Sequence, residues 1–216
     1  MQHLLEIRGR VFADLKDTKV IRNLFAGSLD PRAYVRYLIN AYNYAQYSPK
    51  VMAMAAARCI DTHPELGTYL LHHADEEQGH YRWALEDLRD LNVGETEARA
   101  ARPAPACTAM IGYIHYIAGH ANPVGLFGWM YVLESVGNDL GTAVAKRLQE
   151  SLKGGLRFVA RHGVTDIGHA QELTEQIEKY VRREEDMRDV EYVAEVVADL
   201  YVHMFREIGE EKERWD

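Results

Sequence analysis

The sequence predicts an all-α protein, a bundle of roughly seven or eight helices. Apolar residues recur with a helical period along almost the whole chain, and no stretch alternates for long enough to predict a strand. Two sharp helix starts support this. Asp30-Pro31 and Asn122-Pro123 each place a capping side chain before a proline at the first helical position.

The N-terminal part predicts three helices. Apolar residues from 4 to 24 give an amphipathic helix that should end near Gly27, and a tyrosine-rich helix should run from 31 to 57. Pro49 should kink or divide this second helix, because proline lacks a backbone N–H. A long third helix is expected over residues 65–91, with weak points at its glycines, Gly67 and Gly79.

The remaining chain predicts a loop and then four helices. Two prolines and no periodicity indicate a loop from Gly94 to Pro105. Helices are then expected over about 107–118, 122–152, 156–183 and 190–211, with the charged residues 186–189 as a connection. There is no internal repeat, low-complexity tract or long linker, so we expect one domain over residues 1–216.

Composition narrows the class of protein. A net charge of −8 argues against nucleic acid or an anionic membrane surface as a partner. Two cysteines are too few for a disulfide framework, and no apolar run approaches the roughly 20 residues of a membrane span. The N-terminus lacks the pattern of a signal peptide. We therefore expect a soluble cytoplasmic protein.

Two histidines and a carboxylate share one stripe of the helix expected at 156–183. His162, Asp166 and His169 stand at positions i, i+4 and i+7, within roughly 60° of one another around a helix. Two imidazoles and a carboxylate that converge suit a redox iron with open positions. The alternative is a polar helix face that merely carries two histidines.

Two other segments offer further metal ligands. Either Glu77 (i, i+3) or Glu76 (i, i+4) can share a helix face with His80, and Glu-x-x-His is a building block of di-iron carboxylate bundles. Glu134 follows an apolar run, where a carboxylate without a partner would be costly. A solvated helix face or a hydrogen-bonded core glutamate is the alternative in each case. Together with the stripe, these segments supply three histidines and three carboxylates.

The order of these motifs resembles the haem-oxygenase-like di-iron oxidases, whose fold is shared with TenA- and PqqC-type proteins. The segment 158–169 is the most specific part, and the helix around Glu134 is also similar. The resemblance implies two irons per chain, O2 as co-substrate, and oxidation of an amine, amino acid or fatty acid. It also implies a homodimer. The implied metal ligands are Glu77 or Glu76, His80, Glu134, His162, Asp166 and His169. It leaves His73, one turn before Glu77, as an outer partner of a ligand.

Three other functions compete with the di-iron oxidase. A TenA-type hydrolase needs a cysteine nucleophile two turns before the acid aligned with Glu134, but that position is Gly128 and Cys107 lies elsewhere. A haem-binding oxygenase needs a histidine inside the first helix, whereas His3 is almost at the terminus. A metal-free binding or interaction protein is the third. Several tyrosines, among them Tyr37 and Tyr44, could line a pocket, although aromatic residues at helical spacing are more often core.

Overall fold

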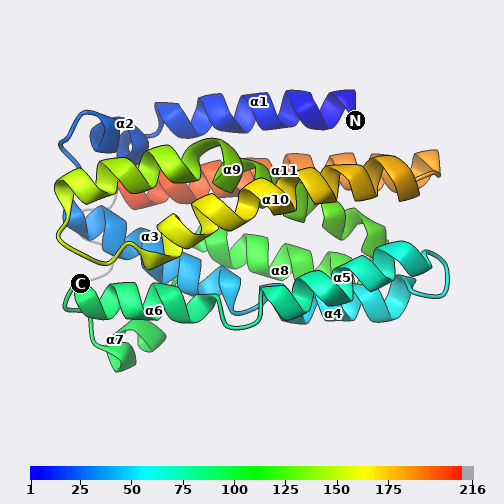
Figure 1. Cartoon of the computed structure of the whole chain (residues 1–216), viewed down its shortest axis with the longest axis horizontal. Coiled ribbons are helices and arrows are strands. Elements are labelled where there is room, and N and C mark those ends of the chain that lie inside the picture. The colour runs from blue at the N-terminus through cyan, green and yellow to red at the C-terminus, as the bar shows by residue number, and fades with distance from the viewer. Residues whose placement is uncertain (211–216) are drawn as a thin grey trace.

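The computed structural model describes residues 1–210, apart from the side chains of residues 164–167, and every regular element in them is helical (Figure 1). The all-α prediction is therefore confirmed. The elements are α1 (Gln2–Asp17), α2 (Lys19–Phe25), α3 (Pro31–Ala45), α4 (Ser48–Cys59), α5 (Pro64–Glu76), α6 (Tyr81–Asp90), α7 (Glu95–Ala100), α8 (Pro105–His120), the 3₁₀ turn η1 (Pro123–Gly125), α9 (Leu126–Ser151), α10 (Arg157–Tyr180) and α11 (Glu184–Glu210).

The helix count exceeds the prediction because each of the first three expected helices is divided. Thr18 has extended backbone between α1 and α2, and its hydroxyl donates to the Leu15 carbonyl at 2.6 Å. The break expected at Pro49 is confirmed, since α3 ends at Ala45 and α4 follows at Ser48. Gly79, with a φ of +95°, separates α5 from α6. That left-handed conformation suits glycine, which has no Cβ to clash.

Two predicted connections are wrong. The expected loop at 94–105 contains α7, which an ion pair between Arg99 and Glu95 (2.7 Å) and burial of Ala98 stabilise. Residues 186–189 belong to α11, which begins at Glu184. The first turn of α11 is acidic, and negative side chains there interact favourably with the positive end of the helix dipole. The charged run that was predicted to be a connection is therefore the start of a helix.

The long helices α9, α10 and α11 run through the middle of the bundle, with α1 along one side and α3–α6 and α8 along the other (Figure 1). Helices α9 and α10 cross very closely. A Cβ on Gly141 would lie 2.7 Å from the Gly163 Cα, so this crossing requires glycine on both helices. Gly163 therefore has a packing role inside a helix that its conformational freedom would otherwise weaken.

A buried carboxylate fixes α10 against α6. Asp87 accepts hydrogen bonds from the backbone N–H groups of Arg157 (2.9 Å) and Phe158 (2.7 Å), the first two residues of α10. These donors have no partner within their own helix. This cap holds the start of α10, which carries His162 and His169, against α6, whose first turn follows His80. No helix in the described part of the chain is long and apolar enough to cross a membrane.

Candidate metal centre

Four elements bring the predicted ligands together in the middle of the bundle. His73 lies on α5, Glu77 and His80 at the α5–α6 junction, Glu134 on α9, and His162 and His169 on α10. Their potential ligand atoms form two groups, in each of which all atoms lie within 4.8 Å of one another. The first contains His73, Glu77, Glu134 and His169, and the second contains Glu77, His80 and His162. Glu77 belongs to both groups and lies between them.

The distances within each group are short. In the first, His73 Nε2 lies 3.2 Å from Glu134 Oε1, and His169 Nδ1 lies 3.7 Å from Glu134 Oε2. In the second, His80 Nδ1 lies 3.0 Å from Glu77 Oε1, yet the two atoms are not aligned for a hydrogen bond. His73 Nε2 and Glu134 Oε1 are thus hydrogen-bonded, whereas His80 and Glu77 hold close donor atoms that do not bond to one another, as expected around a shared metal ion.

The Glu-x-x-His motif folds as a turn rather than within one helix. Glu77 ends α5, Gly79 takes its left-handed conformation, and His80 opens α6. The turn keeps both side chains buried and facing the same centre. A side chain at position 79 would strain this backbone and displace the motif.

The geometry distinguishes Glu77 from Glu76, the two alternatives that the sequence left open for the first carboxylate ligand. The Glu77 side chain is 9 % exposed and joins both groups, whereas the Glu76 side chain is 57 % exposed. Glu76 Oε2 instead lies outside the centre, 3.5 Å from His169 Nε2. Glu77 is therefore the better candidate ligand.

Several buried polar atoms in this centre lack a hydrogen-bond partner among the described residues. They are His73 Nδ1, His80 Nδ1, His169 Nδ1 and Glu134 Oε2. Leaving such groups unpaired costs roughly 1–3 kcal/mol each, and buried polar atoms are ordinarily satisfied. Three of them, His80 Nδ1, His169 Nδ1 and Glu134 Oε2, offer lone pairs to a metal ion, whereas His73 Nδ1 faces Glu76 at 3.7 Å. The residues present thus fit a metal of the iron type.

The pKa shifts suit ligation at His162 and Glu134, whereas a metal ion at His169 would have to displace a proton. His162 Nδ1 donates to the Phe158 carbonyl at 2.8 Å, which leaves Nε2 with a free lone pair. Burial lowers the pKa of His162 and keeps it neutral. Burial opposes ionisation of Glu134, but the adjacent His169 and His73 outweigh it and hold the pKa of Glu134 well below its usual range. For His169, burial lowers the pKa, but the Glu134 carboxylate outweighs it and the pKa is raised.

One side of the centre is covered by Trp83. Its indole stacks on the His80 ring, with centroids 4.0 Å apart, and meets the His162 ring edge-on at 5.4 Å. Such contacts fix the orientation of both imidazoles and exclude water from them.

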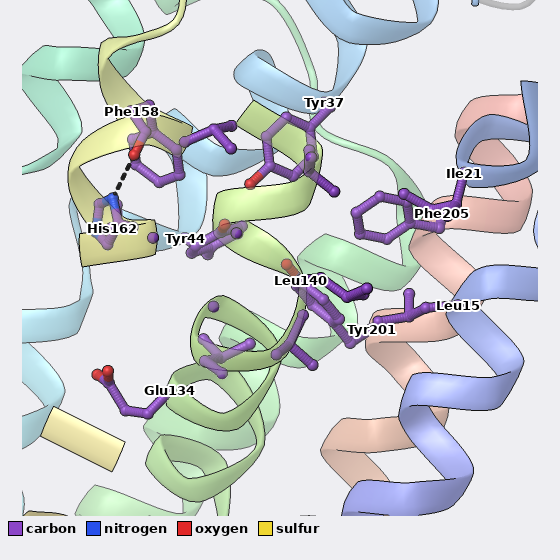
Figure 2. A pocket seen from close by; sticks show the side chains of 18 of the residues that line it. Leu15, Ile21, Tyr37, Tyr44, Glu134, Leu140, Phe158, His162, Tyr201 and Phe205 are labelled. Atoms are coloured by element: carbon purple, nitrogen blue, oxygen red, sulfur yellow. Dashed lines mark hydrogen bonds between the residues drawn. The ribbon is translucent and has the colours of Figure 1, made fainter. Parts of the chain in front are cut away.

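On another side, an apolar cavity reaches the centre. Figure 2 shows Glu134 and His162 on one side of it and Leu15, Ile21 and Phe205 on the other. The cavity holds about 130 Å³ of space open to water-sized molecules, well above the roughly 10–15 Å³ that one water needs. Of the tyrosines predicted as pocket candidates, Tyr37 and Tyr44 line it, and Tyr201 joins them. Its wall is otherwise mostly aliphatic and aromatic.

The structure changes the expected position of His73 and does not describe the side chain of Asp166. His73 is 1 % exposed and stands inside the first group, although the sequence suggested an outer position. Its spacing of one turn before Glu77 was the only available signal. The side chain of Asp166 lies outside the described residues, so its predicted role as a ligand stays a prediction.

The structure also bears on the competing functions. A Cβ at Gly128 would lie 2.1 Å from the Val190 carbonyl oxygen, so no cysteine nucleophile fits there. Cys107 is fully buried, and burial raises the pKa of its thiol to about 12, which suppresses the reactive thiolate. His3 is exposed and pairs with Glu6 and Glu195 rather than facing a cofactor cavity.

The helix order and the central His–carboxylate cluster define a haem-oxygenase-like protein, and comparison with solved structures shows this fold. A domain of unknown function with a heme oxygenase-like fold from Shewanella denitrificans is 24 % identical, with a TM-score of 0.85 over 94 % of this chain and 89 % of that one. A TenA homolog from Pseudomonas syringae pv. tomato is 13 % identical (TM-score 0.75, 96 % and 91 % covered). Heme oxygenase-1 from Synechocystis, solved in complex with heme, is 14 % identical (TM-score 0.71, 95 % and 90 % covered).

The family follows from the sequence comparison. The family model described as "iron-containing redox enzyme" matches residues 35–202, which is more than half of the chain. The chain therefore belongs to this family of iron-containing redox enzymes. No curated protein matches the sequence.

Proposed function

We propose that this protein is a non-haem di-iron oxidase or oxygenase that uses O2 to oxidise a small organic substrate. The observation that carries the proposal is the convergence of buried, unpartnered histidine and carboxylate atoms where an apolar cavity reaches them. The ligands we assign to two irons are Glu77, His80, Glu134, His162, Asp166 and His169, with Asp166 taken from its sequence spacing alone.

The protein's own residues prepare this chemistry in three ways. Glu77 belongs to both groups and would be available to an ion in either one, while the Phe158 carbonyl holds His162 in the tautomer that leaves Nε2 free for a metal. Trp83 and the apolar cavity wall keep water away. When bound, the iron pair would supply dioxygen activation.

The cavity favours one of the substrate classes that the family resemblance allows, namely a molecule with an aliphatic chain such as a fatty acid. One stripe of α9 lines it from Glu134 through Leu140 to Leu148. At 1.5 Å per residue this stripe is about 20 Å long. Apolar substituents gain free energy along such a wall, whereas a charged amino-acid side chain would lose its hydration there.

The activity test is anaerobic loading with Fe(II), followed by exposure to O2. We expect iron uptake, a transient visible absorption band, and O2 consumption that a suitable substrate accelerates. A screen of amines, amino acids and fatty acids identifies that substrate. If the chain takes up no iron and gives no band, it is not a di-iron oxidase, and a metal-free binding protein on this fold becomes the better reading.

The chain-length test uses Leu140→Phe, which enlarges a side chain about 9 Å along the α9 stripe from Glu134. We expect the variant to lose longer chains and keep shorter ones. Leu71→Phe, at an exposed position of α5, is the matched control and should retain the wild-type preference. If Leu140→Phe folds and handles all chain lengths as the wild type does, the chain does not lie along α9. The expected homodimer is a separate proposal, which sedimentation velocity tests.

A further inference from the structure

His73 stands in the centre in the same way as the candidate ligand His169. Each ring turns one nitrogen toward Glu134: His73 Nε2 lies 3.2 Å from Oε1, and His169 Nδ1 lies 3.7 Å from Oε2. The two rings contact each other with centroids 4.5 Å apart. Two imidazoles thus approach the two oxygens of one carboxylate from adjacent directions.

The second nitrogen of each ring, on the side away from Glu134, faces the same residue, Glu76. His73 Nδ1 and His169 Nε2 lie 3.7 and 3.5 Å from the same atom, Glu76 Oε2. A metal-bound histidine ordinarily directs its other ring N–H toward a carboxylate or carbonyl, which fixes its tautomer and raises its basicity. Glu76 is placed to serve both rings at once.

The donor sets of the two positions support the same conclusion. With His169 alone, the position beside Glu134 would have one imidazole, while the position beside His80 has two, His80 and His162. Adding His73 gives each position two imidazoles, with Glu77 between them. Such nitrogen-rich sets suit iron better than carboxylate alone.

We propose that His73 is a seventh protein ligand, bound through Nε2 to the metal ion that Glu134 and His169 hold, with Glu76 as the outer partner of both histidines. This inference rests on the proposed two-metal centre. The competing role is that of a positioning residue, in which His73 Nε2 keeps its proton and donates to Glu134.

The two roles differ in one proton, which NMR detects. In protein labelled with ¹⁵N-histidine and loaded with diamagnetic Zn(II), we expect His73 Nε2 to carry no proton and to show the shift of a metal-bound nitrogen, with the proton on Nδ1. His73→Gln identifies the resonance. A proton retained on His73 Nε2 in the Zn(II)-loaded protein would overturn the inference.

Iron content gives a second test that does not depend on activity. After anaerobic Fe(II) loading and desalting, the wild type should hold about two irons per chain, and His73→Ala and His73→Gln about one. His72→Ala, at the exposed neighbouring position, should keep both. Circular dichroism confirms that each variant is folded.

The outcomes separate this inference from the proposed function. If the wild type holds no iron, both fail. If the wild type and both His73 variants hold the same two irons, only the role of His73 fails. Glu76→Gln should retain both irons at saturating Fe(II) but bind them about tenfold more weakly, as loss of an outer partner does; unchanged affinity would remove Glu76 from the account.

Discussion

Two buried networks of histidine and carboxylate lie in this protein, and they differ in how completely they satisfy themselves. Near the start of α11, the fully buried Asp186 accepts hydrogen bonds at both oxygens, from His63 and Arg183 at Oδ2 and from Asn122 and Arg183 at Oδ1. In the central cluster, by contrast, His80 Nδ1, His169 Nδ1 and Glu134 Oε2 have no hydrogen-bond partner among the described residues.

The difference shows which feature indicates a metal centre. Burial of a histidine beside a carboxylate is common to both networks, so it does not distinguish them. The Asp186 network closes within the protein and connects the α4–α5 turn to α11 and to Asn122, the residue that caps η1. In the central cluster several ligand atoms lie close together without hydrogen-bond partners among the described residues, and the cluster borders a cavity. The first network stabilises the fold, and the second is the one that we propose as the metal centre.

The largest expected effect is on metal binding by Glu77→Gln. Glu77 belongs to both groups, so a neutral amide there should remove the bridge and weaken binding of both ions at least about 100-fold. The free energy of unfolding of the metal-free protein should change by less than about 1 kcal/mol, because the substitution is isosteric. Anaerobic Fe(II) titration and urea denaturation measure the two quantities. Wild-type iron affinity in this variant would exclude Glu77 as a ligand.

The second largest effect is expected for Asp186→Asn, which should lower the free energy of unfolding and leave iron binding unchanged. Asp186→Asn keeps the shape but replaces a charged acceptor of four hydrogen bonds with an amide, and this should lower the free energy of unfolding by about 3 kcal/mol. Iron content should remain at the wild-type level. If Asp186→Asn instead loses iron while remaining folded, the two networks are coupled and the distinction between them is wrong.

The smallest effect is a pH dependence of that stability difference. Burial opposes ionisation of Asp186, but Arg183, Asn122 and His63 outweigh it and lower its pKa. The stabilisation is therefore complete above the ordinary aspartate pKa of about 4 and is lost as the pH falls through the folded-state value. Urea denaturation of the wild type and Asp186→Asn from pH 7 to 3 should show their difference narrowing only below about pH 4. A difference that is constant over this range would mean that folding does not shift the pKa of Asp186.

Much of the fold could be predicted from the sequence because helical periodicity and the Asp-Pro and Asn-Pro starts are local signals. The division at Thr18 and the whole of α7 were missed, because they depend on short-range side-chain contacts, Thr18 with Leu15 and Arg99 with Glu95, that apolar periodicity does not report. The charged residues 186–189 were misread as a connection because two partners of Asp186, His63 and Asn122, lie 123 and 64 positions away in the sequence.

The candidate site shows the same limit. The spacing of His162 and His169 and the apolar surroundings of Glu134 pointed to residues that the fold does bring together. Sequence spacing alone did not reveal that the chain turns at Gly79, which brings Glu77 rather than Glu76 inward. Nor could it reveal the cavity, whose wall comes from α1, α2, α3, α4, α9, α10 and α11 together.

The central claim is that the unclosed cluster is a two-metal centre, and the iron content of the wild-type chain tests it most directly. The protein is loaded anaerobically with Fe(II), desalted and analysed for iron by mass spectrometry, with Glu77→Gln carried through in parallel. We predict about two irons per chain in the wild type and almost none in the variant. A wild-type chain without iron, or a variant with as much iron as the wild type, would contradict the account.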